Sequence, residues 1–574
     1  MFKNNNGWGV CLWLCLMLWG NHHAYSQATY LDVDVGNSLG TYKQFWGGLG
    51  QTSFNEGVLK EPNKSYFKLI QEANSHGREV FNYFCTKAMF TDTPHPGGEE
   101  IGGYVYLEGD DGSVSYNWEI VDQHFDAILG YGLLPIVSFS FMPRKLASVS
   151  DKRNPWNQAY VSPPKSYTKW RNLVYETVDH LKNRYGEAEI KNWYFEVWNE
   201  PDLDEFFWIP HPDQNSYPNK SNNTEYFKFY DFTEDAAHSA SDVIRVGGPA
   251  IAGDIGFFIK PWYPHCISGT NYATGLTGTR VDFISRHHYG ETYKNYDHYM
   301  KFGEIALKDA KELLGDDPTI IITENGPTPF LKEWLNTRYV PAWIVKQVDM
   351  LFDIADEYGI GYIPDILCFW TKPLPKNFGT HFGVATVLGN PWNPPPDGIV
   401  KRPAFNGFDA LSYLSDERIS ITGASFGDRI HGIATKNADK SIEVILYHFD
   451  DDDYDNTKNR QHQVEVTIKN IPFSTGYLRM FKIDETHSNA YTIWKQMGRP
   501  EEPTQDQLLA LKSQDDLQLA EPMSTIQISN GIYKQRLEIQ NNSVALIVIS
   551  ADNPLTQDRV PPDPPTGVDL ENLN

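Results

Sequence analysis

The chain has 574 residues, a net charge of −25 and 40% hydrophobic residues. This length suggests two or three domains with enough apolar content for large cores. The acidic excess disfavours nucleic acid or an anionic membrane as a partner, because both require clustered Lys and Arg. The 16 Trp and 32 Tyr are a weak indication of a carbohydrate ligand, since aromatic rings stack on sugar faces.

Residues 1–26 have the pattern of an export signal. Lys3 precedes an apolar run at residues 10–20 that is too short to span a membrane comfortably, and Ala24 and Ser26 have the spacing of a cleavage site. The remaining cysteines, Cys85, Cys266 and Cys368, are too sparse to indicate a disulfide framework. We therefore expect an exported protein, periplasmic or secreted, that is not inserted in a membrane. The sequence carries no information on the oligomeric state.

The next elements alternate between strand and helix. Residues 27–44 contain TYLDVDV (29–35), which we expect to add a strand to a sheet formed much later in the chain. From residue 45 to 415, eight short, nearly continuous apolar runs alternate with helical stripes such as Trp170, Leu173, Val174, Val178 and Leu181. The eight runs cover residues 45–51, 79–85, 133–140, 192–200, 244–251, 281–289, 319–325 and 365–371. Eight strand–helix pairs predict an α/β fold of the (β/α)8 barrel class, with the active site at the carboxyl ends of the strands.

Beyond residue 415 the hydrophobic pattern changes to a period near two. Strands are predicted at residues 418–423, 430–436, 441–449, 462–470, 535–542 and 543–550, separated by turn residues. We assign residues 416–555 to an accessory antiparallel β-sandwich. Residues 556–574 are rich in Pro and predict a flexible tail.

Two glutamates stand at the ends of apolar strands, where a buried carboxylate is costly unless its environment compensates. Glu200 follows the fourth barrel strand in YFEVWNEPD (194–202), and Glu324 ends the seventh in TIIITENGP (319–327). The ends of these strands face each other across a barrel mouth, so both carboxylates are expected in one pocket. Such a pair is what cleavage of a glycosidic bond requires, one carboxyl donating a proton and the other attacking the anomeric carbon or activating water.

The same region resembles glycoside hydrolase family 39, the β-xylosidase and α-L-iduronidase family. The resemblance runs from about residue 117 to Glu324, and more weakly to about 415. It is carried by PIVSFSFMPRKLAS (135–148), KWRNLVYETVDHLKNRYG (169–186), WYFEVWNEPDLDEFFW (193–208), VGGPA (246–250) and DFISRHHY (282–289). HCISGTNYATGLTG (265–278) is similar to the iduronidase branch.

The resemblance implies a barrel with a β-sandwich, retention of anomeric configuration and no cofactor. It implies Glu200 as acid/base, Glu324 as nucleophile, Asn199 as a ligand of the sugar 2-hydroxyl, and His287 and Tyr289 near the nucleophile. The chain departs from the family in two places. Asn82 and Tyr83 stand where an Arg-x-His pattern is usual, and Tyr289 stands where the iduronidase branch has a Lys. We expect Tyr83 to mark a changed sugar subsite.

Other candidate residues have structural alternatives. Trp370, at the end of the eighth strand, is a candidate sugar platform, and Trp46 on the first strand is another; both could be core aromatics. His287 and His288 have no carboxylate or Cys at ligand spacing, so we predict no metal site. The acidic run at 450–456 lacks the spacing of a calcium loop and favours a solvated hairpin tip over a calcium site.

The sequence therefore predicts a retaining exo-glycosidase that acts on oligosaccharides from plant or algal polysaccharides, with β-xylosidase specificity first. α-L-Iduronidase, β-galactosidase and arabinosidase specificities are alternatives on the same scaffold. Two alternatives of other classes are a non-catalytic carbohydrate-binding barrel, which would normally have lost one of the two carboxylates, and a metal-dependent barrel enzyme.

Overall fold

The structure is a computed structural model that describes most of the chain. The described residues are 28–51, 54, 56–75, 78–94, 101–209, 223–253, 260–290, 310–316, 318–358, 365–370, 378–390, 393–424, 429–438, 440–454 and 456–554. The export signal predicted for residues 1–26 and the tail predicted for residues 556–574 lie outside this set. None of the helices in the described part of the chain is both long and apolar enough to cross a membrane.

Eight parallel strands close into a barrel in the order β10-β11-β2-β3-β6-β7-β8-β9. Each predicted strand of the barrel is present, and the (β/α)8 prediction is confirmed. The strands are β2 (Gly48–Gln51), β3 (Tyr83–Thr86), β6 (Leu134–Ser138), β7 (Tyr194–Glu196), β8 (Arg245–Ile251), β9 (Phe283–Tyr289), β10 (Ile320–Gly326) and β11 (Ile366–Trp370).

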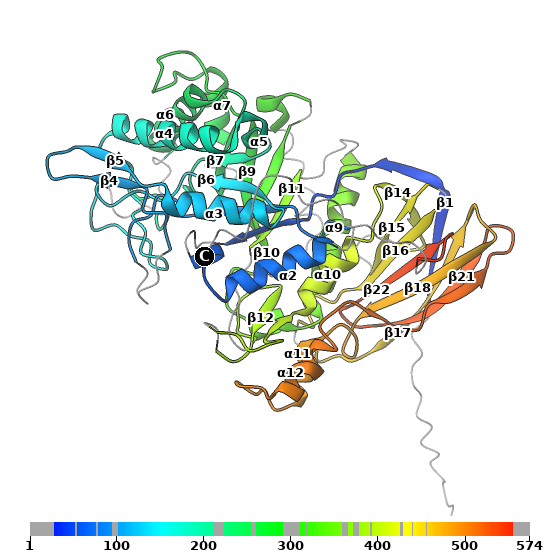
Figure 1. Cartoon of the computed structure of the whole chain (residues 1–574). Helices are drawn as coiled ribbons and strands as arrows, with labels where there is room; N and C mark the ends of the chain where they lie inside the picture. Colours follow the sequence, from blue (N-terminus) through cyan, green and yellow to red (C-terminus); the bar gives the residue numbers. More distant parts are fainter. Residues whose placement is uncertain are drawn as a thin grey trace, which may run out of the picture.

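The helices of this region lie outside the strands (Figure 1). They are α1 (Glu56–Leu59), α2 (Asn63–Ser75), α3 (Glu119–Gly130), α4 (Tyr167–Tyr185), α5 (Glu187–Ile190), α6 (Asn223–Ala240), α7 (Lys260–Ser268), the short η3 (Glu333–Asn336), α9 (Tyr339–Tyr358) and α10 (Pro403–Leu411). Two small hairpins accompany them, formed by β4 (Tyr106–Glu108) with β5 (Val114–Tyr116) and by β12 (Ala385–Val387) with β13 (Ile399–Lys401).

Helix α4 illustrates how the sequence sets these elements. Ser166 caps its start by accepting a hydrogen bond from the Lys169 amide, and Gly186, with a φ of 82°, follows its last residue. The predicted apolar stripe is buried throughout, and Trp170 donates from its ring nitrogen to Thr233 of α6 at 2.8 Å. A helix is held on the barrel mainly by such an apolar face rather than by its intrinsic propensity.

The second layer is a ten-stranded sheet. Its strands are β1 (Thr29–Thr41), β14 (Glu417–Thr422), β15 (Ile430–Asn437), β16 (Ser441–His448), β17 (Gln461–Lys469), β18 (Thr475–Ile483), β19 (Gln518–Leu519), β20 (Ser524–Gln527), β21 (Tyr533–Gln540) and β22 (Ser543–Ser550). Two helices, α11 (Ala490–Gln496) and α12 (Gln505–Lys512), follow β18.

The order of the sheet places the amino-terminal strand among the carboxy-terminal ones. β1 pairs antiparallel with β14 and parallel with β17, and the blue β1 lies beside the yellow and orange strands in Figure 1. The sheet is therefore mixed, whereas the sequence analysis expected an antiparallel one. The parallel pair arises because β1 comes from the other end of the chain and needs no hairpin to reach β17.

Helices α9 and α10 lie between the barrel and this sheet (Figure 1). Alternate residues of β22 divide between two cores. Val544, Leu546 and Val548 belong to the core that the sheet shares with α9 and α10. Ala545, Ile547 and Ile549 belong to the core formed by the strands of the sheet alone. β22 and likewise β16 are therefore buried on both faces, because the barrel helices cover the outer one.

Polar contacts fix the same junction. Asp349 of α9 is buried, and its Oδ2 lies 2.5 Å from Nδ1 of His431 on β15. The hydroxyl of Tyr447 on β16 donates to the same oxygen at 2.8 Å. One carboxylate thus joins the barrel to two strands of the sheet, and its neighbours satisfy the charge that burial would otherwise penalise.

The double burial of β16 makes a stability prediction. Ile445→Ala should lower the free energy of unfolding by about 2–5 kcal/mol, because it leaves a cavity between the sheet and the barrel. Thr525→Ala on the exposed strand β20 is the matched control and should change it by less than about 0.5 kcal/mol. Chemical denaturation of both variants tests this. Equal stabilities would contradict the tight packing of this face.

Candidate active site

The turn after β7 presents Glu200. Trp198 and Glu200 adopt positive φ angles of 73° and 48°, which side chains other than Gly rarely do. Three hydrogen bonds hold the turn. The Glu200 amide donates to the Ala250 carbonyl at 2.9 Å, the Trp198 ring donates to the Phe206 carbonyl at 2.8 Å, and the Ser138 hydroxyl donates to the Trp198 carbonyl at 2.9 Å. Strain of this kind persists where surrounding contacts determine the backbone, as happens at functional sites.

Glu324 comes from the opposite side of the barrel. The pairing of β10 with β9 shifts register between Ile322 and Glu324, and this irregularity sets Glu324 beside His287. The Tyr289 hydroxyl, at the end of β9, donates to Glu324 Oε2 at 3.0 Å.

His287 joins the two carboxylates. Its Nδ1 lies 2.7 Å from Glu200 Oε1 and 3.4 Å from Glu324 Oε2, and one polar atom of each of the three residues lies within 4.8 Å of the others. All three side chains are buried. The structure thus brings Glu200, Glu324, His287 and Tyr289 together as the sequence predicted, with His287 closer to Glu200 than to Glu324.

Burial governs the proton affinity of this group. Burial, reinforced by the Asp202 charge, raises the pKa of Glu200 to about 8. Burial also raises the pKa of Glu324 to about 7, opposed by His287, Lys87 and the Tyr289 hydrogen bond. The pKa of His287 falls below its ordinary value, chiefly through burial, so the ring is neutral. Between the two carboxyl values Glu324 is ionised and Glu200 is protonated, which are the states of a nucleophile and an acid.

A buried ion pair lies in the same barrel, and the sequence analysis missed its cation. Lys87, just past the end of β3, pairs with Glu196 of β7, and both side chains are almost completely buried. The Thr323 hydroxyl, beside Glu324, donates to the other oxygen of Glu196 at 2.6 Å. In the sequence Glu196 is a charged residue inside an apolar strand, and a carboxylate buried there needs a cation as partner. The residues around Glu196 in the sequence do not indicate that this cation is Lys87.

Of the other residues predicted to bind substrate, Asn199 and Trp370 lie at the carboxyl ends of barrel strands, as expected. Asn199 is 3% exposed, and its Oδ1 finds no partner among the described residues, so it can bind a ligand. Trp370 ends β11 and is partly exposed. Its ring faces Gly50 of β2, where a Cβ would come within 2.9 Å of it.

Tyr83 is a correction. It begins β3, its ring is 6.1 Å from that of Tyr194 at the start of β7, and it joins the apolar cluster at the amino ends of the strands. Asn82 precedes it, with its backbone amide bonded to Gly47. The side chains that alternate on the inner face of β3 are Tyr83, Cys85 and then Lys87, so Lys87, not Tyr83, reaches the catalytic level. The predicted change of the sugar subsite at Tyr83 is wrong.

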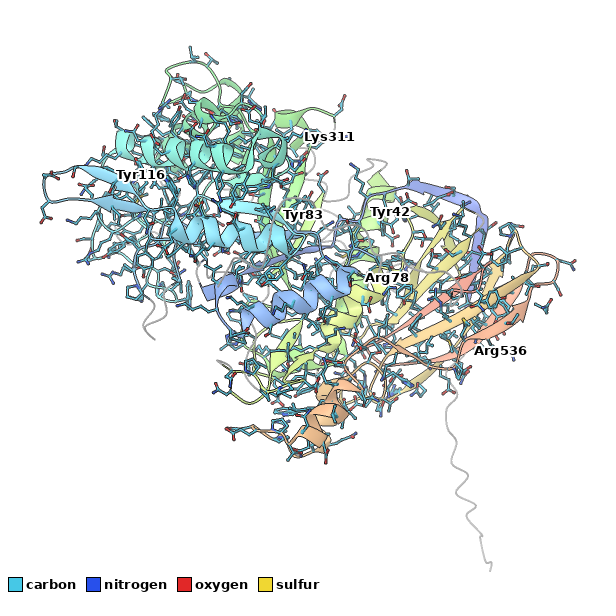
Figure 2. All side chains as sticks on the ribbon, viewed as in Figure 1. Tyr42, Arg78, Tyr83, Tyr116, Lys311 and Arg536 are labelled. Carbon is cyan, nitrogen blue, oxygen red and sulfur yellow. The ribbon has the colours of Figure 1, made fainter. Side chains whose placement is uncertain are left out.

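Trp46 is a second correction. It is 1% exposed and packs on Phe352 of α9 and on Tyr42, which Figure 2 labels between the barrel and the sheet. It precedes β2, on the amino side of the barrel. Its ring belongs to the core, which was the alternative explanation.

Two places in the sequence were considered as metal sites, His287–His288 and the acidic run at 450–456. Among the described residues, Glu200, His287 and Glu324 are the one group of such side chains close enough together to hold an ion, so carboxylates do lie near His287 in space although not in sequence. In the acidic run, Asp450 accepts from Arg429 and Lys458, and Asp453 accepts from the Thr457 and Lys458 amides; residue 455 lies outside the described set.

Comparisons with known proteins agree with this geometry. The model of the family described as glycosyl hydrolases family 39 matches residues 99–529. A β-xylosidase from Geobacillus stearothermophilus is 27% identical over 513 residues, which cover 86% of this chain and 90% of the relative. The α-L-iduronidase of Homo sapiens is 22% identical over 464 residues, which cover 75% of this chain and 67% of the relative.

Solved structures match the whole architecture. A monomeric β-xylosidase from Caulobacter crescentus CB15 gives a TM-score of 0.71 at 21% identity and covers 91% of this chain and 99% of its own. A bacterial orthologue of human α-L-iduronidase gives 0.70 at 18% identity and covers 92% of this chain and 84% of its own. With a family model matching most of its length and two facing glutamates in the barrel mouth, the chain belongs to glycoside hydrolase family 39 and is a glycosidase that cleaves O-glycosyl bonds.

Proposed function

We propose that the protein is a retaining exo-glycosidase of β-xylosidase type that releases sugars from oligosaccharides of plant or algal polysaccharides. The observation that carries this is the proximity of Glu200 and Glu324, with carboxylate oxygens within 4.8 Å. Retaining enzymes hold their two carboxyl groups about 5–5.5 Å apart, whereas inverting ones need about 6.5–9.5 Å to admit a water molecule. The exported location suggested by residues 1–26 suits a polymeric substrate outside the cell and belongs to the same proposal.

In the first step, an oxygen of Glu324 forms a bond to the anomeric carbon as the bond to the leaving oxygen breaks. Glu200 gives its proton to that oxygen and becomes a carboxylate. In the second step, Glu200 takes a proton from water, the water oxygen bonds to the anomeric carbon, and Glu324 leaves as a carboxylate. The enzyme returns to its starting protonation state.

The other residues bind and orient. Asn199 Oδ1, which has no partner among the described residues, is available to a ligand group such as the sugar 2-hydroxyl, and Trp370 supplies a partly exposed aromatic face. The Tyr289 hydroxyl keeps Glu324 ionised by donating to it, and the neutral His287 bridges to Glu200. Specificity for xylose is supported by the β-xylosidase relatives and by Tyr289, which stands where the iduronidase branch has a uronate-binding Lys.

A panel of aryl glycosides tests the specificity. We expect the highest kcat/KM with the β-xyloside, and the activity should survive EDTA, since carboxyl groups carry the chemistry. The α-L-iduronide, β-galactoside and arabinoside are the other arms of the panel. Preference for one of them would replace xylose on the same scaffold, and turnover of none would favour a non-catalytic barrel.

The raised carboxyl pKa values predict the pH dependence of kcat/KM. Activity should rise as Glu324 ionises near pH 7 and fall as Glu200 loses its proton near pH 8, giving a narrow optimum between them. The measurement is kcat/KM with an aryl glycoside from about pH 5 to about pH 10. A broad optimum well below pH 6, with both limbs on the acid side, would contradict the strong effect of burial on the pair.

Two substitutions separate the roles of the glutamates. Glu324→Ala should abolish turnover of every substrate, and added azide should restore it with an inverted glycosyl azide as product. Glu200→Gln should lower activity on oligosaccharides by about 10²–10⁴-fold but spare an aryl glycoside with a good leaving group, because that group departs without a proton.

Azide distinguishes this assignment from its reverse. With Glu200→Gln it should give a glycosyl azide of unchanged configuration, since it attacks the glycosyl-enzyme; an inverted product would exchange the two roles. Glu176→Gln, on the exposed face of α4, is the matched carboxylate control and should behave as the parent enzyme.

A further inference from the structure

The mechanism above leaves the ion pair of Lys87 and Glu196 unused. Both side chains lie inside the barrel, 1% and 0% exposed, with Thr323 completing the hydrogen bonds of Glu196. A buried ion pair is weak evidence for stability, because apolar residues of the same volume usually serve the fold as well or better. The inner layer toward the amino ends of the strands is in fact apolar, formed by Cys85, Ile136, Phe283, Ile321, Ile366 and Cys368.

The ion pair is attached to the two strands that bear the catalytic residues. Glu196 precedes Glu200 by four residues at the end of β7, and Thr323 precedes Glu324 on β10. Lys87, just past the end of β3, pairs with Glu196, and Thr323 donates to Glu196, so the three side chains connect β3, β7 and β10 beside the two glutamates.

The chemistry gives such a cation a task at each stage. In the free enzyme the two glutamates, Glu200 and Glu324, together carry one negative charge, and it lies on Glu324. After attack, Glu324 is an ester and the negative charge has moved to Glu200. A fixed ammonium near both carboxylates stabilises that charge wherever it lies, and it needs no rearrangement between the two steps.

We propose that Lys87 is a positioning residue of the catalytic pair, whose ammonium, anchored by Glu196, holds the single negative charge that alternates between Glu324 and Glu200; the Thr323 hydroxyl in turn fixes Glu196. The inference rests on the proposed roles of these two glutamates and adds a residue that touches neither the sugar nor the reacting atoms.

Electrostatics supports the geometry. Lys87 lowers the pKa of both Glu200 and Glu324, while Glu196 raises that of Glu200 more weakly. Although burial opposes both charges, the pKa of Lys87 is raised by Glu196 and that of Glu196 is lowered by Lys87, so the pair stays ionised. The titratable and charged groups in the described part of the chain that interact with Lys87 or with the two glutamates are Cys85, Glu196, Asp202, Glu205, His287, Tyr289 and Cys368.

The test compares the pH profiles of kcat/KM for three variants on an aryl glycoside, each first checked for a folded state by circular dichroism. Lys87→Met should move the acid limb about one pH unit upward, which is about a tenfold loss on that limb. Glu196→Gln should move the basic limb downward, because removing its charge lowers the pKa of Glu200. Opposite movements of this kind would not follow from general loosening of the barrel.

The third variant guards against misfolding. Lys87→Met combined with Glu196→Gln leaves no unpaired buried charge, yet it still lacks the ammonium, so its acid limb should remain above that of the parent. Lys469→Met, in the sheet, is the matched control and should leave both limbs in place. If the double variant is folded and active with parental limbs, Lys87 has only a structural role. The azide products of the Glu324→Ala and Glu200→Gln variants test the proposed function separately. An error in the roles of the two glutamates would therefore be distinguished from an error in the role of Lys87.

Discussion

Closure of the barrel between its last and first strands is the constraint on which the site depends. Trp370, Phe369 and Cys368 of β11 pair with Gly50, Leu49 and Gly48 of β2, and the glycines allow this approach. A Cβ on Gly48 would come within 2.5 Å of the Cys368 sulfur. Closing the sheet is what sets the ends of β7 and β10 opposite each other, because strands that curve round a common axis aim their carboxyl ends at one mouth.

The barrel mouth lowers the stability of the fold, because it buries two carboxyl groups and contains strained backbone angles. Burial withdraws the two carboxyl groups from water and raises the pKa of Glu200 to about 8 and that of Glu324 to about 7, so that near neutral pH one can be protonated while the other is ionised. The neutral His287 and the Tyr289 hydroxyl compensate from β9, and Lys87 does so from below. Strained φ angles at Trp198 and Glu200 belong to the same balance, since the turn after β7 must deliver a side chain rather than continue the strand.

The sequence by itself determined the barrel and the meeting of Glu200 and Glu324 in one site. Parallel strands covered on both sides appear as short unbroken apolar runs, so all eight barrel strands were found. A carboxylate at the end of such a run is costly enough to stand out, and two of them indicated one site. The strand β18 was missed because Gly, Tyr, Arg and Lys interrupt its pattern, and the two-sided burial of β16 and β22 was missed because a period of two cannot register a helix packed on the outer face.

Only the tertiary structure decided which residues share a level of the barrel. Alternation along β3 correctly places Tyr83, Cys85 and Lys87 on the inner face, but it does not give their height along the barrel, so Tyr83 was assigned to the mouth although it lies two layers below Lys87. Trp46 was assigned to the sugar site for the same reason, but it lies in the core beside α9. The partner of Glu196 lies 109 residues away, and the parallel β1–β17 pair joins opposite ends of the chain. Local sequence sets which way a side chain faces, whereas strand stagger and chain closure in three dimensions set what it meets.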